Sequence, residues 1–239
     1  MKYLLLLLLL LPLSADAGRE VPTGATDDTI SSTDGRTNVT GRGTGTTFVV
    51  AGWFNVLGSA SQGDFDNLYS ESMPGDQQLN IFLRINGNIN FFYRPGGFGN
   101  PSCSITDTGV YDDGKWHWYT FIGSADNAYT AYVDGIQTAA TCTTSLTTSN
   151  TLSGIILNAA SGQSLVVGAK FGRTMNWRQS LPIQVVKAAM YGFVLVKPNV
   201  FWPMLGIGTT EVDWSGNGLT GTVAGGMPGS SNPPIGRLF

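Results

Sequence analysis

Short apolar stretches alternate with polar turn sequences along most of the chain. The clearest case spans residues 112–135, DDGKWHWYTFIGSADNAYTAYVDG, where Asp-Gly turns enclose the apolar segments Trp116–Ile122 and Tyr129–Val133. Asp-Gly between apolar strands is a strong hairpin signal, because glycine tolerates the positive φ that tight turns require. The pattern therefore predicts two strands, joined by the polar connection Gly123–Asn127 and followed by a turn at Asp134-Gly135.

The same pattern predicts strands on both sides of this hairpin. We expect them at Thr29–Thr33, Phe48–Leu57, Leu79–Ile85, Ile89–Tyr93, Ser164–Gly168, Ile183–Val196 and Leu219–Val223, with turns at Asn86–Asn88 and Ser215–Gly218. A helix over Val185–Tyr191 is the alternative for one of them, but Pro182, Pro198 and the valine content favour a strand. Evenly spaced short strands are typical of a β-sandwich or barrel. No repeat or linker divides the chain, so we expect one all-β domain over residues 18–239.

The first 17 residues have a different character. Lys2 precedes the apolar run Leu4–Leu11, and Ala15-Asp16-Ala17 supplies small residues for cleavage, as in a secretory signal peptide. A retained membrane anchor is the alternative, but this run is far shorter than the roughly 20 residues that span a bilayer. We therefore expect a secreted protein, or one on a cell or virion surface, with no membrane span.

Composition narrows the classes of function further. Charged residues make up 12% of the chain, the net charge is −3, and Lys and Arg form no cluster. Nucleic-acid binding therefore has no electrostatic footprint in this sequence. Cys103 and Cys142 are the two cysteines, which in an exported protein predicts a disulfide, with two buried free thiols as the alternative.

Several segments resemble laminin-G-like domains of the concanavalin A-like lectin/glucanase superfamily. DGKWH…YVDG matches a signature of these domains, FVVAGWFNV is similar to their FTISAWV strand, and SLVVGAK is similar to LYIGG. DWSGNGLTGTVAGG resembles their closing D-SGNGN-GT element, whereas AMYGFVLV lacks the acidic residues of the IDEVRIYN strand whose place it takes. The resemblance implies two antiparallel sheets in a jelly-roll β-sandwich, and its relatives often bind calcium at the rim.

Two routes to catalysis are weakly supported. His117, the single histidine, lies on a strand with aromatic residues on both faces, which favours a structural role, and no G-x-S-x-G elbow supplies a nucleophile. The glucanase pattern E-x-D-x-x-E begins at Glu211 and Asp213, but residue 216 is glycine. We therefore predict no catalytic residues and no enzymatic activity.

Calcium is the more plausible ion, because hard cations bind carboxylate, amide and hydroxyl oxygens on loops. The candidate ligands are Asp213, Ser215 and Asn217 in the closing loop, Asp27 and Asp28 near the N-terminus, and Asp107, Asp112 and Asp113. Asp-x-Ser-Gly-Asn-Gly is also good turn chemistry without a metal, so both interpretations stay open.

Sugar binding would use exposed aromatic rings surrounded by polar groups. Trp177, in the polar segment GRTMNWRQS, is the best candidate, followed by Tyr93 and Phe98 around Arg94, although core packing is the alternative for each ring. Asn38 begins the single N-x-[ST] sequon, a glycosylation site if the host has the machinery.

Together these features predict a secreted, non-catalytic module that binds carbohydrate or glycoprotein, through rim loops or the concave sheet face, with calcium as a candidate cofactor. The alternative is a structural subunit of a filament, surface layer or virion that associates with copies of itself. A glycoside hydrolase is the third hypothesis, kept because the superfamily includes glucanases.

Overall fold

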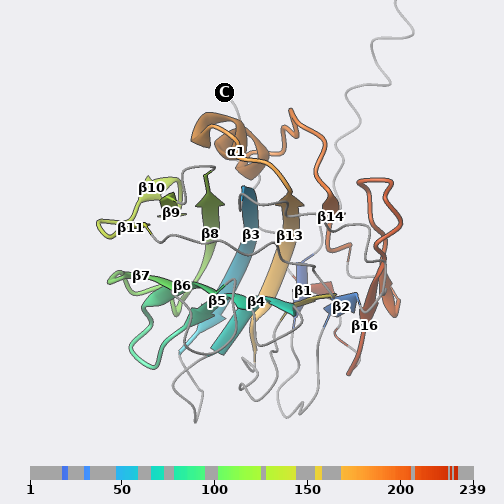
Figure 1. The fold of residues 1–239 in the computed structure, drawn as a ribbon. Helices are drawn as coiled ribbons and strands as arrows, with labels where there is room; N and C mark the ends of the chain where they lie inside the picture. Colours follow the sequence, from blue (N-terminus) through green and yellow to red (C-terminus); the bar gives the residue numbers. More distant parts are fainter. Residues whose placement is uncertain are drawn as a thin grey trace, which may run out of the picture.

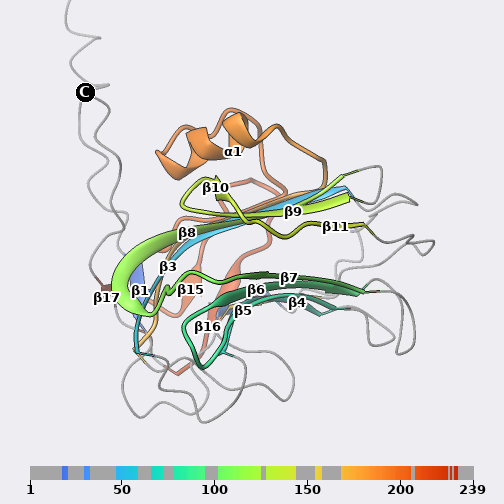
Figure 2. The same ribbon diagram turned by 90° about the vertical axis from the view of Figure 1, so that its left-hand side faces the viewer.

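A computed structural model describes residues 18–20, 30–32, 47–58, 66–72, 78–94, 102–124, 128–143, 154–157, 168–205, 208–225, 227 and 229–230. Within these residues two antiparallel sheets face each other, and one helix lies on the outer side of one sheet (Figures 1 and 2). The structure confirms the predicted all-β, two-sheet antiparallel jelly-roll sandwich.

Sheet A is centred on the pairing of β3 (Phe48–Leu57) with β8 (Asp113–Gly123). Its order is β10-β9-β8-β3-β13-β1-β17, with β11 beside β9 and β14 beside β13. The other bounds are β1 (Gly18–Glu20), β9 (Ala128–Val133), β10 (Ile136–Gln137), β11 (Cys142–Thr143), β13 (Lys170–Trp177), β14 (Val200–Trp202) and β17 (Gly229–Ser230). Asp134 and Gly135 both have positive φ, 52° and 74°, so the predicted Asp-Gly turn is present after β9.

Sheet B has the order β15-β16-β2-β12-β4-β5-β6-β7. Its bounds are β2 (Ile30–Ser32), β4 (Asp66–Ser72), β5 (Gln78–Leu83), β6 (Ile89–Arg94), β7 (Cys103–Asp107), β12 (Gly154–Leu157), β15 (Thr210–Glu211) and β16 (Gly221–Val223). The hairpin β5–β6 closes over the predicted Asn86–Asn88 turn, where Arg84 N donates to Asn88 O at 2.8 Å.

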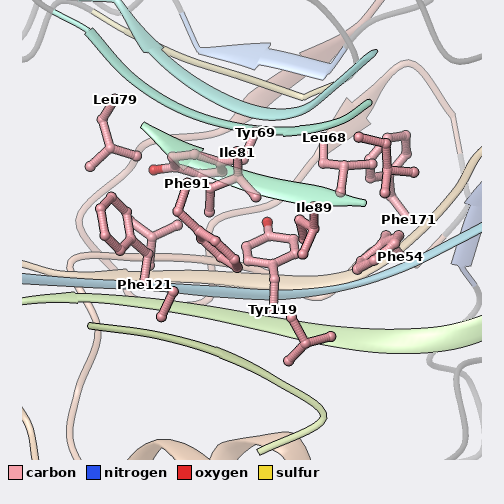
Figure 3. Close-up of a cluster of buried hydrophobic side chains, with 14 of the residues drawn as sticks. Phe54, Leu68, Tyr69, Leu79, Ile81, Ile89, Phe91, Tyr119, Phe121 and Phe171 are labelled. Atoms are coloured by element: carbon pink, nitrogen blue, oxygen red, sulfur yellow. The ribbon is translucent and has the colours of Figure 1, made fainter. Parts of the chain in front are cut away.

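The core lies between the sheets and is rich in aromatic side chains (Figure 3). Successive strand residues point to opposite faces, so every second residue of each strand is available to this layer. Phe48 of sheet A contacts Tyr93 of sheet B edge to face, with ring centroids 5.2 Å apart. Such pairs add to the burial of apolar area that holds the two sheets together.

The helix α1 (Ile183–Met190) corrects the predicted strand over Ile183–Val196. Helix α1 lies on the outer side of sheet A (Figure 2). Val186, Ala189 and Met190 share one helical face and are buried in one cluster with Trp53, Trp118 and Trp177 of sheet A. Pro182 precedes the first turn, and Gly192 (φ 98°) ends the helix: Gly192 N donates to Ala189 O at 3.0 Å and Phe193 N to Ala188 O at 2.9 Å. These bonds form a Schellman motif. Pro182 before the helix and Gly192 after it therefore favour a helix, whereas the valine content had favoured a strand.

The remaining strand predictions are confirmed in part. Those at Thr29–Thr33, Phe48–Leu57, Leu79–Ile85, Ile89–Tyr93, Trp116–Ile122, Tyr129–Val133 and Leu219–Val223 each overlap an observed strand. Residues 164–167 lie outside the described part of the chain. The sequence pattern did not indicate β4, β7, β13 or β14.

The predicted disulfide is present between Cys103 and Cys142, with Cα atoms 5.8 Å apart. It joins β7 of sheet B to β11 of sheet A, so it ties the two sheets together at one edge. Closing a loop of this length stabilises the fold by roughly 4 kcal/mol in the chain-entropy model. Among the described residues, no helix has the length and apolar character to cross a membrane.

Candidate functional site on the outer face of sheet B

The hairpin β5–β6 carries two kinds of side chain on its two faces. Leu79, Ile81 and Leu83 of β5 are fully buried in the core, as are Ile89, Phe91 and Tyr93 of β6. The alternate residues point outward, away from sheet A, because side chains alternate along a strand: Asn80, Phe82, Asn90, Phe92 and Arg94. In the described part of the chain, no helix or strand lies over this outer face (Figure 2).

The strand register arranges asparagines and phenylalanines alternately on this face. Asn80 lies directly opposite Phe92, and Phe82 lies directly opposite Asn90. Both rings are half-buried, whereas both amides are recessed. The arrangement places an aromatic ring beside an amide at two successive positions along the hairpin.

Hydroxyl groups of the flanking strands extend the polar part of this face. On β4, Ser70 Oγ donates to Asn80 Oδ1 at 2.8 Å. On β7, Thr106 Oγ1 and Ser104 Oγ accept from Asn90 Nδ2 at 2.7 and 3.1 Å. The two amides are therefore held in fixed orientations by a hydrogen-bond network that includes hydroxyl groups of β4 and β7.

Arg94 supplies charge at one end of this face. Its guanidinium carbon lies 5.8 Å from the centroid of the Phe92 ring, a cation–π geometry. The outward positions of β5, β6 and β7 carry no Asp or Glu. We refer to Asn80, Phe82, Asn90, Phe92 and Arg94 as the sheet B face. Its rings, amides and guanidinium suit a flat ligand with many hydroxyl groups.

Two of the predicted sugar-binding rings lie elsewhere. Trp177 is 1% exposed, on β13 beneath α1, and its Nε1 donates to Val196 O at 2.9 Å, so the prediction of an exposed ring is wrong. Tyr93 points into the core, because its position on β6 has the opposite parity to Phe92, and it is also fully buried. Arg94 does lie on the sheet B face, and Phe98 is outside the described residues.

The closing loop forms the turn that was the alternative to a calcium site. Asp213 Oδ1 accepts from Phe201 N and Ser215 N at 3.0 and 2.9 Å, and Oδ2 accepts from Ser215 Oγ and Leu219 N at 2.7 and 3.0 Å. Asn217 Nδ2 donates to Asn199 O at 2.8 Å. The carboxylate oxygens of Asp213 are thus occupied by the protein's own donors, and this arrangement does not fit a cation.

The other calcium candidates that the structure describes, Asp107, Asp112 and Asp113, are not gathered into one site. Among the described residues no group of three or more His, Cys, Asp or Glu side chains is placed to hold a metal ion. Asp27, Asp28 and the sequon residue Asn38 lie outside the described residues, so they stay predictions. Calcium binding therefore stays a prediction, which titration of the protein with Ca²⁺ would test.

Glu211, the first residue of the incomplete glucanase pattern, is buried. It forms an ion pair with Arg19 Nε, and its Oε2 accepts from Leu205 N at 3.2 Å. Arg19 also donates to the carbonyl oxygens of Gly208 and Met227 at 3.0 and 2.9 Å. This network joins β1 to the C-terminal segment, which gives Glu211 a structural role.

His117 lies at the end of the sandwich, between the rings of Phe54 and Tyr111. Its Nδ1 is 2.8 Å from Asp134 Oδ2 and its Nε2 is 3.0 Å from Asp113 Oδ1. Both ring nitrogens are thus engaged, as expected for a structural histidine. Burial alone would lower the pKa of His117, but the hydrogen bonds and charges of Asp134 and Asp113 outweigh it and raise the pKa above 6.5.

The pKa of His117 leads to a prediction about stability. Because the folded-state pKa exceeds the unfolded value, the stabilisation is fully present below about pH 6.5 and is lost as the pH rises through the folded pKa. We expect His117→Gln to destabilise the protein more at pH 5.5 than at pH 8.5, as measured by urea unfolding. Because the chain has one histidine, its NMR titration gives the pKa directly, and a midpoint at or below 6.5 would contradict the prediction.

The two asparagine–phenylalanine pairs were missed from the sequence, although a signal was present. The chain alternates Leu-Asn-Ile-Phe-Leu before the Asn86–Asn88 turn and Ile-Asn-Phe-Phe-Tyr after it. The apolar residues of one parity are buried, so the residues of the other parity must share the outer face. Trp177 was the predicted sugar-binding ring, but Trp118, Trp177 and Trp202 are all core residues.

Comparison with known proteins supports the fold. No protein-family model and no curated protein matches the chain. Among solved structures it is similar to a heptameric SAP-like pentraxin from Limulus polyphemus, with a TM-score of 0.60, 10% identity, and coverage of 94% of this chain and 98% of that one. A candidate carbohydrate-binding protein from Bacteroides ovatus gives a TM-score of 0.64 at 12% identity, over 92% of this chain and 62% of that one.

Domains LG4-5 of the mouse laminin α1 chain are also similar, with a TM-score of 0.52 and 15% identity, over 70% of this chain and 43% of that one. The segments that resemble laminin-G-like domains include β3 and β8, the central strands of sheet A. The sequence resemblance and the structural similarity therefore agree, and the chain has the concanavalin A-like jelly-roll fold.

Proposed function

We propose that this chain is an exported, non-catalytic module that binds carbohydrate, free or on a glycoprotein, through the sheet B face. The observation that carries the proposal is the cross-strand arrangement of Asn80 with Phe92 and of Phe82 with Asn90. An aromatic ring covers the apolar side of a sugar, while neighbouring amide and hydroxyl groups bond to its hydroxyls. The similarity to a candidate carbohydrate-binding protein supports the same class of ligand.

Two observations support export. The signal-peptide pattern occupies residues 1–17, and Cys103 and Cys142 are joined by a disulfide. Disulfides persist in oxidising compartments and are rare in the cytosol. Mass spectrometry of the exported protein would test the expected start at Gly18.

Replacing Phe92 by alanine should weaken glycan binding by about tenfold or more, because buried aromatic rings dominate recognition surfaces. A glycan array would identify a ligand, and calorimetry would compare the variant with the wild type. Trp214→Ala is the matched control, since this ring is half exposed but contacts Phe201 outside the sheet B face. Lost binding in the control with unchanged binding in Phe92→Ala would move the site elsewhere.

Addition of EDTA is expected to leave this binding unchanged. The residues of the sheet B face include no carboxylate that could hold calcium. Binding that disappears with EDTA and returns with Ca²⁺ would instead support the predicted calcium dependence, and would direct attention to the rim loops.

A further inference from the structure

A set of exposed apolar side chains follows helix α1. Tyr191, Phe193 and Leu195 are between 42% and 67% exposed. Val194 and Val196, which alternate with these residues along the chain, pack inward against the cluster beneath α1. We call Tyr191, Phe193 and Leu195 the α1 patch. Because the alternate residues Val194 and Val196 are half-buried against the protein, the three side chains of the α1 patch point outward.

The backbone of the α1 patch is held at both ends. Phe193 N donates to Ala188 O at the end of the helix, and Val196 O accepts from Trp177 Nε1. Asn199 N then donates to Asn176 O at 2.7 Å. The three apolar side chains are therefore presented on a defined backbone, as in a preformed contact surface.

A second exposed apolar set lies at the end of the sandwich where β3 ends and β8 begins. Leu57, Ile85 and Val110 are between 60% and 75% exposed. Leu57 is the last residue of β3, directly before one loop, and Ile85 and Val110 lie in two other loops. We call them the rim patch. Hydrogen bonds join the three loops: Gly58 N donates to Asp112 O at 2.8 Å, and Tyr111 N donates to Gly87 O at 2.9 Å.

The two patches differ in charge. Asp107, Asp112 and Asp113 lie around the rim patch, with Arg84 and Lys115 as nearby cations, so the acidic charges are in excess. Residues 136–210, which include the α1 patch, contain five Lys and Arg residues and no Asp or Glu, and two of the five, Lys170 and Arg178, form ion pairs with Glu20 and Glu71. Lys187 and Lys197 stand on either side of the α1 patch in sequence. An apolar surface in a basic region thus complements an apolar surface in an acidic one.

We propose that the α1 patch of one copy of this chain binds the rim patch of a second copy. In such a pair one molecule keeps an unused α1 patch and the other keeps an unused rim patch. The contact is therefore head-to-tail, and its repetition produces a ring or an open filament. A symmetric dimer through either patch would instead bring like charges together. A heptameric pentraxin has a structure similar to that of this chain. The proposed contact does not include the sheet B face, so it is independent of glycan binding.

The test uses the full chain expressed with its own leader for export, and two variants that leave the core untouched. Leu195→Asp alters the α1 patch and Val110→Asp alters the rim patch. Each variant replaces an apolar side chain of the contact by a carboxylate, so it should associate about tenfold or more weakly than the wild type. Sedimentation velocity over a concentration series measures this, and circular dichroism confirms that both variants fold.

Mixing the two variants separates a head-to-tail contact from a symmetric one. One intact α1 patch and one intact rim patch then remain, so the mixture should form heterodimers and nothing larger. Ile136→Asp is the control, because this side chain is also exposed but belongs to neither patch, and it should associate as the wild type does. Electron microscopy of the wild type would distinguish rings from filaments.

A wild type that stays monomeric throughout the series would overturn the proposal. So would variants that associate normally, or a mixture that forms no heterodimer. Vesicles of phosphatidylserine provide a further arm: a monomeric wild type that binds them, with binding lost in Leu195→Asp, would assign the α1 patch to an anionic lipid surface instead.

Discussion

Replacing Glu71 by alanine is expected to lower the free energy of unfolding by about 3–5 kcal/mol, because it removes one partner of a buried ion pair. Glu71 Oε2 accepts from Arg178 Nη1 at 3.3 Å, and the two side chains are 0% and 7% exposed. Removal of the carboxylate leaves the guanidinium in a poorly hydrated site. Urea unfolding with the disulfide intact measures the loss.

The effect should be large because Glu71 connects the two sheets. Glu71 and Tyr69 come from β4 of sheet B, and Asn176 comes from β13 of sheet A. Asn176 Nδ2 donates to Glu71 Oε1 and Tyr69 Oη at 2.6 and 2.8 Å, and Tyr69 Oη donates to Glu71 Oε1 at 2.8 Å. Burial, reinforced by the charge of Glu71, raises the pKa of Tyr69, so its hydroxyl stays protonated and can donate.

Glu20→Ala is the matched control. Its carboxylate is 3.8 Å from Lys170 Nζ, but both side chains are partly exposed, so its loss should cost about 0–1 kcal/mol. The double variant Glu71→Met, Arg178→Met should recover much of the stability, because apolar pairs of similar volume replace buried ion pairs well. Equal effects of Glu71→Ala and Glu20→Ala would show that the inter-sheet network contributes little.

Local turn chemistry explains why much of the fold could be predicted. Asp134-Gly135 adopts the positive φ values that such a dipeptide favours, and Phe48–Leu57 was identified with its observed bounds. These signals depend on a few adjacent residues. They need no information about distant parts of the chain.

Strand β13 shows why other elements were missed. Arg173, Thr174 and Asn176 interrupt its apolar pattern, so the segment looked like a polar loop, yet all three are buried. The Nδ2 group of Asn176 donates to Glu71, which is 105 residues away in sequence. Buried polar residues can thus conceal a strand when their partners lie on another sheet.

The candidate site on the sheet B face could be predicted from the sequence in part. The hairpin around Asn86–Asn88 was predicted, and a turn centred there determines which residues face each other across β5 and β6. The Asn80–Phe92 pair therefore follows from the sequence once the register is considered. The hydroxyls of Ser70 and Thr106 do not, because the order of β4, β5, β6 and β7 in the sheet is a tertiary property.

Replacing Trp177 by alanine is expected to destabilise the protein by about 3–5 kcal/mol, as for other large-to-small substitutions in a core. Its indole lies in the cluster beneath α1 and donates to Val196 O. The variant loses this packing and leaves a cavity between the helix and sheet A. Thermal and urea unfolding would measure the change.

This variant also separates the two interpretations of Trp177. A buried ring predicts lower stability with unchanged glycan affinity at temperatures where the variant is folded, whereas a surface ring that stacks on sugar predicts the reverse. Trp214→Ala is the matched comparison, because half of that ring is already exposed and its truncation should cost far less. Reduced affinity at full stability in Trp177→Ala would place the binding site on the helix side of sheet A, and the sheet B face would then lose its role.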